Sequence, residues 1–142
     1  MGPIDGPLRE ATLHHIGVAV KSVEKAIPVY QDLFGYELFS GPFDDPIQHV
    51  SVCFLQRPGE GEIVVELVAP LEGDTPISRI LVKREGPYHT CYEVRNLDQS
   101  LAELSAKKCI VIGEPVPAVT FNQRRIVWLV TPTQQLVELP ER

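Results

Sequence analysis

The chain has little of what marks membrane, secreted or metal-thiolate proteins. Among its 142 residues there are only three cysteines, Cys53, Cys91 and Cys109, with no C-x-x-C pair, which argues against a thiolate zinc site and a disulfide framework. We expect three buried free thiols in a cytoplasmic protein. No apolar run approaches the roughly 20 residues that cross a bilayer, and residues 1–12 lack the apolar stretch of a signal peptide.

Positive charge is also scarce. The formal net charge is −6, with 13 Lys and Arg against 19 Asp and Glu. Nucleic acids need a basic footprint for their phosphates, so we expect no nucleic-acid partner. A small molecule or another protein is the expected class of partner.

The first half of the chain carries alternating apolar strands around one amphipathic helix. Ser22 is a typical helix cap and Gly35 a typical stop, while Pro28 inside that helix predicts a kink or a late start. The stretch GPFDDP at 41–46 predicts a turn. The expected elements are a strand at 13–20, a helix from Ser22 to Phe34, and strands at 36–40, 48–55 and 63–70.

The second half repeats this order after a linker. Asp74 or Thr75 caps a short linker helix within 71–86, and Asn96 caps the next helix. The expected elements are a strand at 88–94, a helix at 97–108, a strand at 109–112, a loop at 115–119, and strands at 124–130 and 135–139. Both halves therefore have the order β-α-β-β-β, which indicates an internal duplication.

Two pairs of residues match when the halves are aligned. "LHHIGVAVKSVEKA" aligns with "YHTCYEVRNLDQS", which matches His15 with His89, and "VVELVAP" aligns with "LVELPER", which matches Glu66 with Glu138. Each half thus supplies one His on its first strand and one Glu on its last. If these strands are neighbours, each His and Glu can point to the same face. Two imidazoles and two carboxylates suit one divalent ion such as Zn, Co, Ni, Mn or Fe.

We therefore predict an α+β fold in which two βαβββ modules form a curved eight-stranded mixed sheet around a metal site. The expected organisation has an N-terminal lead-in at 1–12 and a single domain at 13–140. Within that domain we place module one at 13–70, the linker helix at 71–86 and module two at 87–140.

Four stretches resemble a known superfamily. They are "LHHIGVAVKSVEKAIPVYQDLFGYEL", "ELVAPLEGDTPISRILVKREG", "YHTCYEVRNLDQSLAEL" and "LVELPE", and together they cover most of residues 13–140. They are similar to the vicinal oxygen chelate superfamily, which includes glyoxalase I, bleomycin resistance proteins and dioxygenases. Within it the chain most resembles the methylmalonyl-CoA epimerases, whose linker segment is like the one found here.

This resemblance implies a site and a reaction. The metal ligands of the family fall on His15, Glu66, His89 and Glu138, and the family's common step removes a proton next to a carbonyl. Glu138 is the implied base, and either Glu66 or a metal-bound water is the candidate for the opposite face. One departure is that an acid-base Glu of the epimerases falls here on Val52.

The resemblance favours a metal-dependent isomerase acting on methylmalonyl-CoA or a related acyl-CoA, as a homodimer. One alternative is a glyoxalase I-like lyase or another isomerase of the superfamily. A metal-free binding protein is a second, which the His and Glu pairs disfavour. An extradiol-type oxygenase is a third, and a fourth ligand at Glu66 argues against it because oxygen chemistry needs an open position.

Overall fold

The computed structural model describes residues 6–73 and 75–142, which divide into two compact units. The first unit, residues 15–88, holds most of module one and the linker helix. The second unit holds residues 89–142 together with the N-terminal residues up to His14. Residues 1–5 of the expected lead-in and Asp74, one of the two expected caps, lie outside the described residues.

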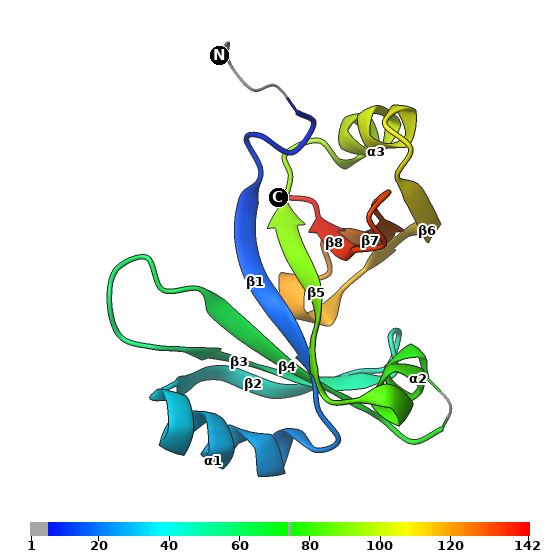
Figure 1. The fold of residues 1–142 in the computed structure, drawn as a ribbon. Helices are drawn as coiled ribbons and strands as arrows, with labels where there is room; N and C mark the ends of the chain where they lie inside the picture. The colour runs from blue at the N-terminus through cyan, green and yellow to red at the C-terminus, as the bar shows by residue number, and fades with distance from the viewer. Residues whose placement is uncertain (1–5, 74) are drawn as a thin grey trace. The chain divides into compact units, whose positions relative to one another are not determined.

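The first unit is a four-stranded mixed sheet with two helices (Figure 1). Its strand order is β2-β3-β4-β1, in which β1 and β4 are parallel and the other neighbours are antiparallel. Its elements are β1 (Thr12–Ala19), which begins in the second unit, α1 (Val23–Phe34), β2 (Glu37–Asp45), β3 (Val50–Gln56), β4 (Val64–Pro70) and α2 (Pro76–Lys83).

The second unit repeats this arrangement. Its order is β5-β8-β7-β6, and β5 and β8 are the parallel pair. Its elements are β5 (Gly86–Glu93), whose first residues belong to the first unit, α3 (Leu97–Ala106), β6 (Ile110–Pro117), a short 3-10 turn (Val119–Phe121), β7 (Arg125–Val130) and β8 (Leu136–Pro140). The expected α+β class, the duplicated βαβββ order and the mixed pairing of strands are therefore confirmed.

The two faces of each sheet have different partners. In the first unit, alternate residues such as Val18 and Leu67 pack under α1, whereas Ala19 and Val68 pack on the other face with Ile77 of α2. In the second unit, Leu97 and Leu104 of α3 pack with the cluster of Val127, Leu129, Val137 and Leu139 on one face. The opposite face carries a separate cluster of Cys91, Ala118, Phe121 and Ile126.

The helix ends follow the expected caps. The Ser22 hydroxyl accepts from the Lys25 N–H, and Gly35 ends α1 at φ 72°. Thr75 caps α2 and Asn96 caps α3 in the same way. The expected late start at Pro28 is wrong, because α1 is helical from Val23. Pro28 is exposed, so water can bond the carbonyl that lacks an intrahelical N–H. No helix within the described ranges is both long and apolar enough to cross a membrane.

Both expected breaks next to the edge strands are wrong. The 41–46 turn is mostly part of β2, and the 115–119 loop is partly taken by β6, which extends to Pro117. The register of β2 against β3 shifts between Ser40 and Phe43, and the register of β6 against β7 shifts between Ile112 and Val116. Both are edge strands, which tolerate such bulges and prolines. Gly41 has φ 93°, and a Cβ there would lie 2.9 Å from the Val52 carbonyl oxygen, so this position needs glycine.

The cysteines are free thiols, as expected. Cys53 and Cys91 are fully buried, but the expected burial is wrong for Cys109, which is partly exposed just before the edge strand β6. Burial, followed by the nearby Glu66 carboxylate, raises the pKa of Cys53 to about 12. Because only the thiolate is a strong nucleophile, Cys53 is inert near neutral pH.

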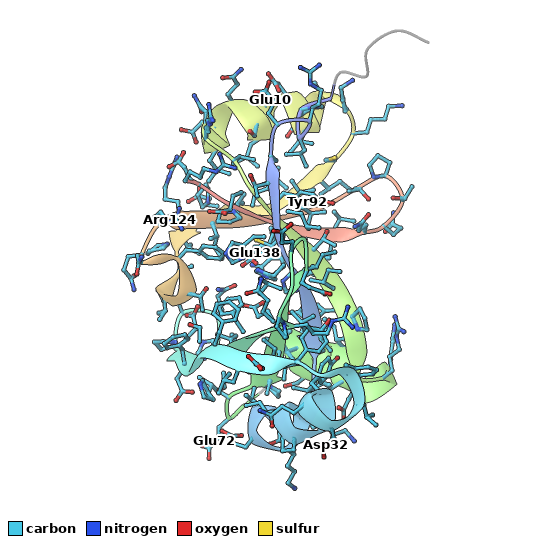
Figure 2. All side chains as sticks on the ribbon, turned by 90° about the vertical axis from the view of Figure 1, so that its left-hand side faces the viewer. Glu10, Asp32, Glu72, Tyr92, Arg124 and Glu138 are labelled. Atoms are coloured by element: carbon cyan, nitrogen blue, oxygen red, sulfur yellow. The ribbon has the colours of Figure 1, made fainter. Side chains whose placement is uncertain are left out.

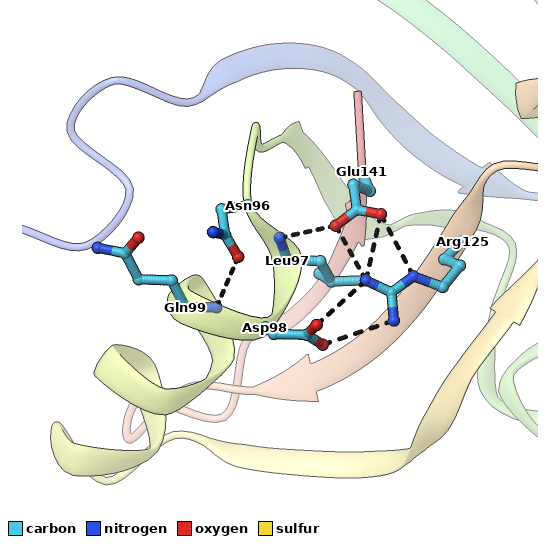
Figure 3. A network of polar contacts seen from close by, with 6 residues as sticks. All are labelled: Asn96, Leu97, Asp98, Gln99, Arg125 and Glu141. Atoms are coloured by element: carbon cyan, nitrogen blue, oxygen red, sulfur yellow. Dashed lines mark hydrogen bonds and ion pairs between the residues drawn. The ribbon is translucent and has the colours of Figure 1, made fainter.

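A polar network joins the C-terminal residues to the start of α3 (Figure 3). The Glu141 carboxylate accepts from the Leu97 N–H at 3.0 Å and from Arg125 Nη2 at 2.9 Å, and Asn96 accepts from the Gln99 N–H at 3.0 Å. Arg125 also reaches Asp98 at 3.5 Å. The Arg125 guanidinium and then the Leu97 N–H lower the pKa of Glu141. The network therefore satisfies helix donors that Asn96 alone cannot.

Glu141→Gln is expected to lower stability by about 1 kcal/mol at pH 7, a value discounted for solvent screening. Because the folded-state pKa of Glu141 is lowered, its contribution is full above the ordinary value and is lost as the pH falls below it. Urea unfolding at pH 7 and at pH 3 measures this difference, which should shrink at pH 3. The control is Glu60→Gln, which removes an exposed carboxylate from a loop. A Glu141→Gln deficit that is equal at both pH values would contradict the account.

Candidate active site

The first unit buries a histidine and a carboxylate side by side. His15 of β1 is 0% exposed and Glu66 of β4 is 5% exposed. Their nearest atoms, His15 Nε2 and Glu66 Oε1, are 3.2 Å apart. The Phe54 ring packs edge-on against the imidazole with ring centroids 5.5 Å apart. The pair lies on the sheet face that carries Ala19, opposite the face covered by α1.

The second unit buries the matching pair. His89 of β5 is 4% exposed and Glu138 of β8, labelled in Figure 2, is 3% exposed. His89 Nε2 and Glu138 Oε1 are 3.5 Å apart. The Trp128 ring packs edge-on against His89 at 4.8 Å between centroids, so each imidazole has an aromatic neighbour. This pair lies on the sheet face opposite α3.

The register of the strands explains why both units make the same pair. Glu66 lies opposite Gly17 in the parallel β1–β4 pairing, and Glu138 lies opposite Cys91 in the β5–β8 pairing. In each unit, therefore, the Glu stands beside the residue two positions after the His. Residues two apart on a strand share a face. The first and last strands of each half are neighbours, which is the condition for the His and the Glu of that half to lie on one face, and each unit brings its own His and Glu together.

The donor chemistry of these pairs fits a divalent ion. Imidazole nitrogen and carboxylate oxygen are ordinary ligands of zinc and its neighbours in the transition series. A buried carboxylate costs several kcal/mol unless a cation or hydrogen-bond donors compensate it. In each unit an imidazole nitrogen already lies close to the carboxylate oxygen, so both side chains offer donor atoms in one place.

Val52 is the position on which the sequence placed the acid-base Glu of the epimerases. It is 3% exposed on β3, and it packs with Ala19 on the face that carries His15 and Glu66. The buried carboxylate nearest to it in sequence is Asp45, which is held by the backbone N–H groups of Ile47 and Gln48 at 3.0 and 3.1 Å and by the Gln48 amide at 3.0 Å. Asp45 thus closes a turn rather than replacing an acid-base group.

The sequence did not single out Trp128 as a neighbour of His89, or the ion pair of Arg124 with Glu93 in the same unit. The alternation of RRIVWLV at 124–130 places residues 124, 126 and 128 on one face, and that signal was available. The sequence did not show which strand this face meets, because that depends on the order β5-β8-β7 in the sheet.

Two βαβββ modules, each with a matched buried His–Glu pair, define a paired-module fold. The sequence profile of the Glyoxalase/Bleomycin resistance protein/Dioxygenase superfamily matches residues 14–128. The chain belongs to this superfamily.

Its relatives include named epimerases. The mitochondrial methylmalonyl-CoA epimerase of Bos taurus is 36% identical over 104 residues, which are 72% of this chain and 57% of that protein. The ethylmalonyl-CoA/methylmalonyl-CoA epimerase of Cereibacter sphaeroides is 29% identical over 119 residues, 82% of this chain and 86% of that protein. This chain thus spans little more than half the length of the bovine relative.

A solved structure extends the similarity in three dimensions. The hypothetical protein BH1468 from Bacillus halodurans C-125 is 30% identical and has a TM-score of 0.80, covering 94% of this chain and 96% of its own. This fold similarity agrees with the α+β class and the repeated module.

Proposed function

We propose that this chain is a metal-dependent isomerase that removes and returns a proton α to a thioester carbonyl, with methylmalonyl-CoA or a related acyl-CoA as its substrate. The observation that carries the proposal is the pair of buried His–Glu half-sites in equivalent register. The named epimerases among the relatives support the choice of substrate. A homodimer in the cytoplasm is part of the proposal.

His15, Glu66, His89 and Glu138 would together hold one divalent ion, chosen from Zn, Co, Ni, Mn or Fe. The proposal requires both half-sites to face the same ion, and the duplication supports it because each module contributes the same donors. When bound, the ion supplies Lewis-acid stabilisation of the charge that develops on the thioester oxygen. An ion that accepts more than these four ligands would also be able to bind the thioester oxygen of the substrate.

Proton transfer would fall to the carboxylates. Glu138 takes the α-proton as the C–H bond breaks, and the electron pair moves into the enolate. Glu66, from the other module, first takes a proton from water and then delivers it to the opposite face, which inverts the carbon, and Glu138 afterwards releases its proton to water. Val52 has no ionisable group, so Glu66 is the carboxylate of the first unit to which we assign this step. Glu138 is 3% exposed, with His89 Nε2 3.5 Å away and Trp128 opposite it in the β7–β8 pairing, and this burial limits water around the carboxylate and strengthens its electrostatic interactions.

The test is solvent-deuterium wash-in. Purified protein reconstituted in turn with each candidate metal is incubated in deuterium oxide with methylmalonyl-CoA, and mass spectrometry follows the α-carbon. We expect one deuterium per molecule to enter at a rate far above the rate without protein. The hemithioacetal of methylglyoxal and glutathione is the parallel substrate. If only the hemithioacetal is turned over, the protein is a glyoxalase I-like lyase and not an epimerase. If methylmalonyl-CoA shows no exchange with any of the metals, the proposed acyl-CoA substrate is wrong.

A further inference from the structure

Arg124 and Glu93 are charged residues on the same sheet face as His89 and Glu138. Glu93 follows His89 and Cys91 at alternate positions of β5, and Arg124 precedes Ile126 and Trp128 at alternate positions leading into β7. Arg124 Nη1 lies 3.5 Å from Glu93 Oε2. Both Arg124 and Glu138 are labelled in Figure 2.

The Arg124 guanidinium is held in place by uncharged contacts. Its Nε donates to the Phe121 carbonyl oxygen at 3.0 Å, and its central carbon lies 5.6 Å from the centroid of the Phe121 ring. Phe121 is itself 2% exposed. The support is therefore rigid, and the Arg124 side chain is still 39% exposed. The Nε edge of the guanidinium is thus bonded to the backbone, while Nη1 lies 3.5 Å from Glu93 Oε2.

The neighbouring Arg125 provides a comparison, because its guanidinium is bonded to two carboxylates. Arg125 makes two bonds to Glu141 through Nη2, at 2.9 and 3.1 Å, and also reaches Asp98. Arg124 has a single long contact to Glu93, and a bidentate partner is the geometry that a guanidinium favours. Arg124 thus retains donor capacity, and its orientation is set before any anion binds.

The distance from the proposed reaction centre indicates which part of a substrate would meet Arg124. Glu93 is four residues beyond His89 along β5, or about 13 Å at the usual rise of a strand. A group bound there is remote from the carbon that exchanges its proton. An acyl-CoA carries its phosphates at the far end of an extended arm, whereas the carboxylate of a malonyl thioester is attached to the reacting carbon itself.

We propose that Arg124 binds a phosphate of the nucleotide arm of the substrate, and that Glu93 holds the guanidinium until that phosphate displaces it. This inference rests on the proposed acyl-CoA substrate. Arg124 is then a specificity-determining residue: it distinguishes thioesters of coenzyme A from thioesters that lack phosphate. Glu93 is a competitor of the ligand, so removing its charge favours binding.

Equilibrium dialysis of the full chain against coenzyme A and against pantetheine, which lacks phosphate, tests the proposal. Arg124→Gln is expected to weaken coenzyme A binding about tenfold, the loss of one charge-assisted contact, and to leave pantetheine binding unchanged. Glu93→Gln is expected to bind coenzyme A more tightly than the wild type. In the exchange assay, Arg124→Gln should raise KM with little change in kcat.

The two variants have opposite expected effects, which separates ligand binding from a structural ion pair. A structural pair would make Arg124→Gln and Glu93→Gln equally harmful to both binding and thermal stability, and that result would overturn the proposal. Equal coenzyme A affinity in the wild type and Arg124→Gln would also overturn it, as would the absence of coenzyme A binding by the wild type. One combination of results would contradict this inference alone. If the wild type exchanges the α-proton and Arg124→Gln binds coenzyme A normally, the proposed function stands and the role of Arg124 is wrong.

Discussion

Glu138→Gln is expected to slow deuterium wash-in into methylmalonyl-CoA by about 10³-fold, within the range that a general base contributes. The amide has nearly the same size as the carboxylate, and its oxygen can still lie near His89 Nε2, but it cannot take a proton. The measurement is the exchange rate of metal-loaded protein, followed by mass spectrometry at saturating substrate.

The control for this variant is Glu93→Gln, which removes a carboxylate from the same sheet face of the same unit. It should exchange the α-proton at close to the wild-type rate when substrate is saturating. Metal content is measured in both variants, so that a lost ion is not mistaken for a lost base. If fully metal-loaded Glu138→Gln exchanges the proton as fast as the wild type, then Glu138 is not the base.

His15→Ala and His89→Ala are each expected to lose the metal and, with it, the metal-dependent part of the stability. A ligand bound only by the folded state stabilises it by about 2.7 kcal/mol at a hundredfold excess over Kd. Wild-type protein should therefore show a lower Tm in the presence of EDTA, whereas neither variant should respond to EDTA. Elemental analysis of the purified proteins gives the metal content directly.

His49→Asn is the matched control, because it removes an exposed imidazole of the first unit. Asn tolerates the left-handed backbone that His49 adopts at φ 59°. This variant should keep its metal and its response to EDTA. Full metal occupancy in either His15→Ala or His89→Ala, with wild-type affinity, would show that the two half-sites do not share an ion as proposed.

Local chemistry was enough to predict most of the elements. The Ser22, Thr75 and Asn96 side chains each accept a backbone N–H at the helix start where they were expected to cap. These contacts span only three residues, so the sequence already contains both partners. The repeat of the βαβββ order could be predicted for the same reason, since alternation and capping are read within short windows.

The candidate pairs could be named from the sequence because the duplication provides an internal comparison. His15 with Glu66 and His89 with Glu138 stand out only when the halves are aligned. Their contact depends on strand order and register, which the alignment did not contain. Glu66 stands opposite Gly17 and Glu138 opposite Cys91 because β1 and β5 each pair in parallel with the last strand of their own module.

Tertiary structure alone decided the features that depend on partners distant in the chain. The residues around Gly41 and Val116 have the composition of turns, but they extend β2 and β6 because an edge strand can add a bulge and still bond its neighbour. Arg124 and Arg125 are neighbours in the sequence and have the same side chain. Strand alternation sends Arg125 to Glu141 and Arg124 to Glu93, on opposite faces of one sheet, so only the folded chain gives them different roles.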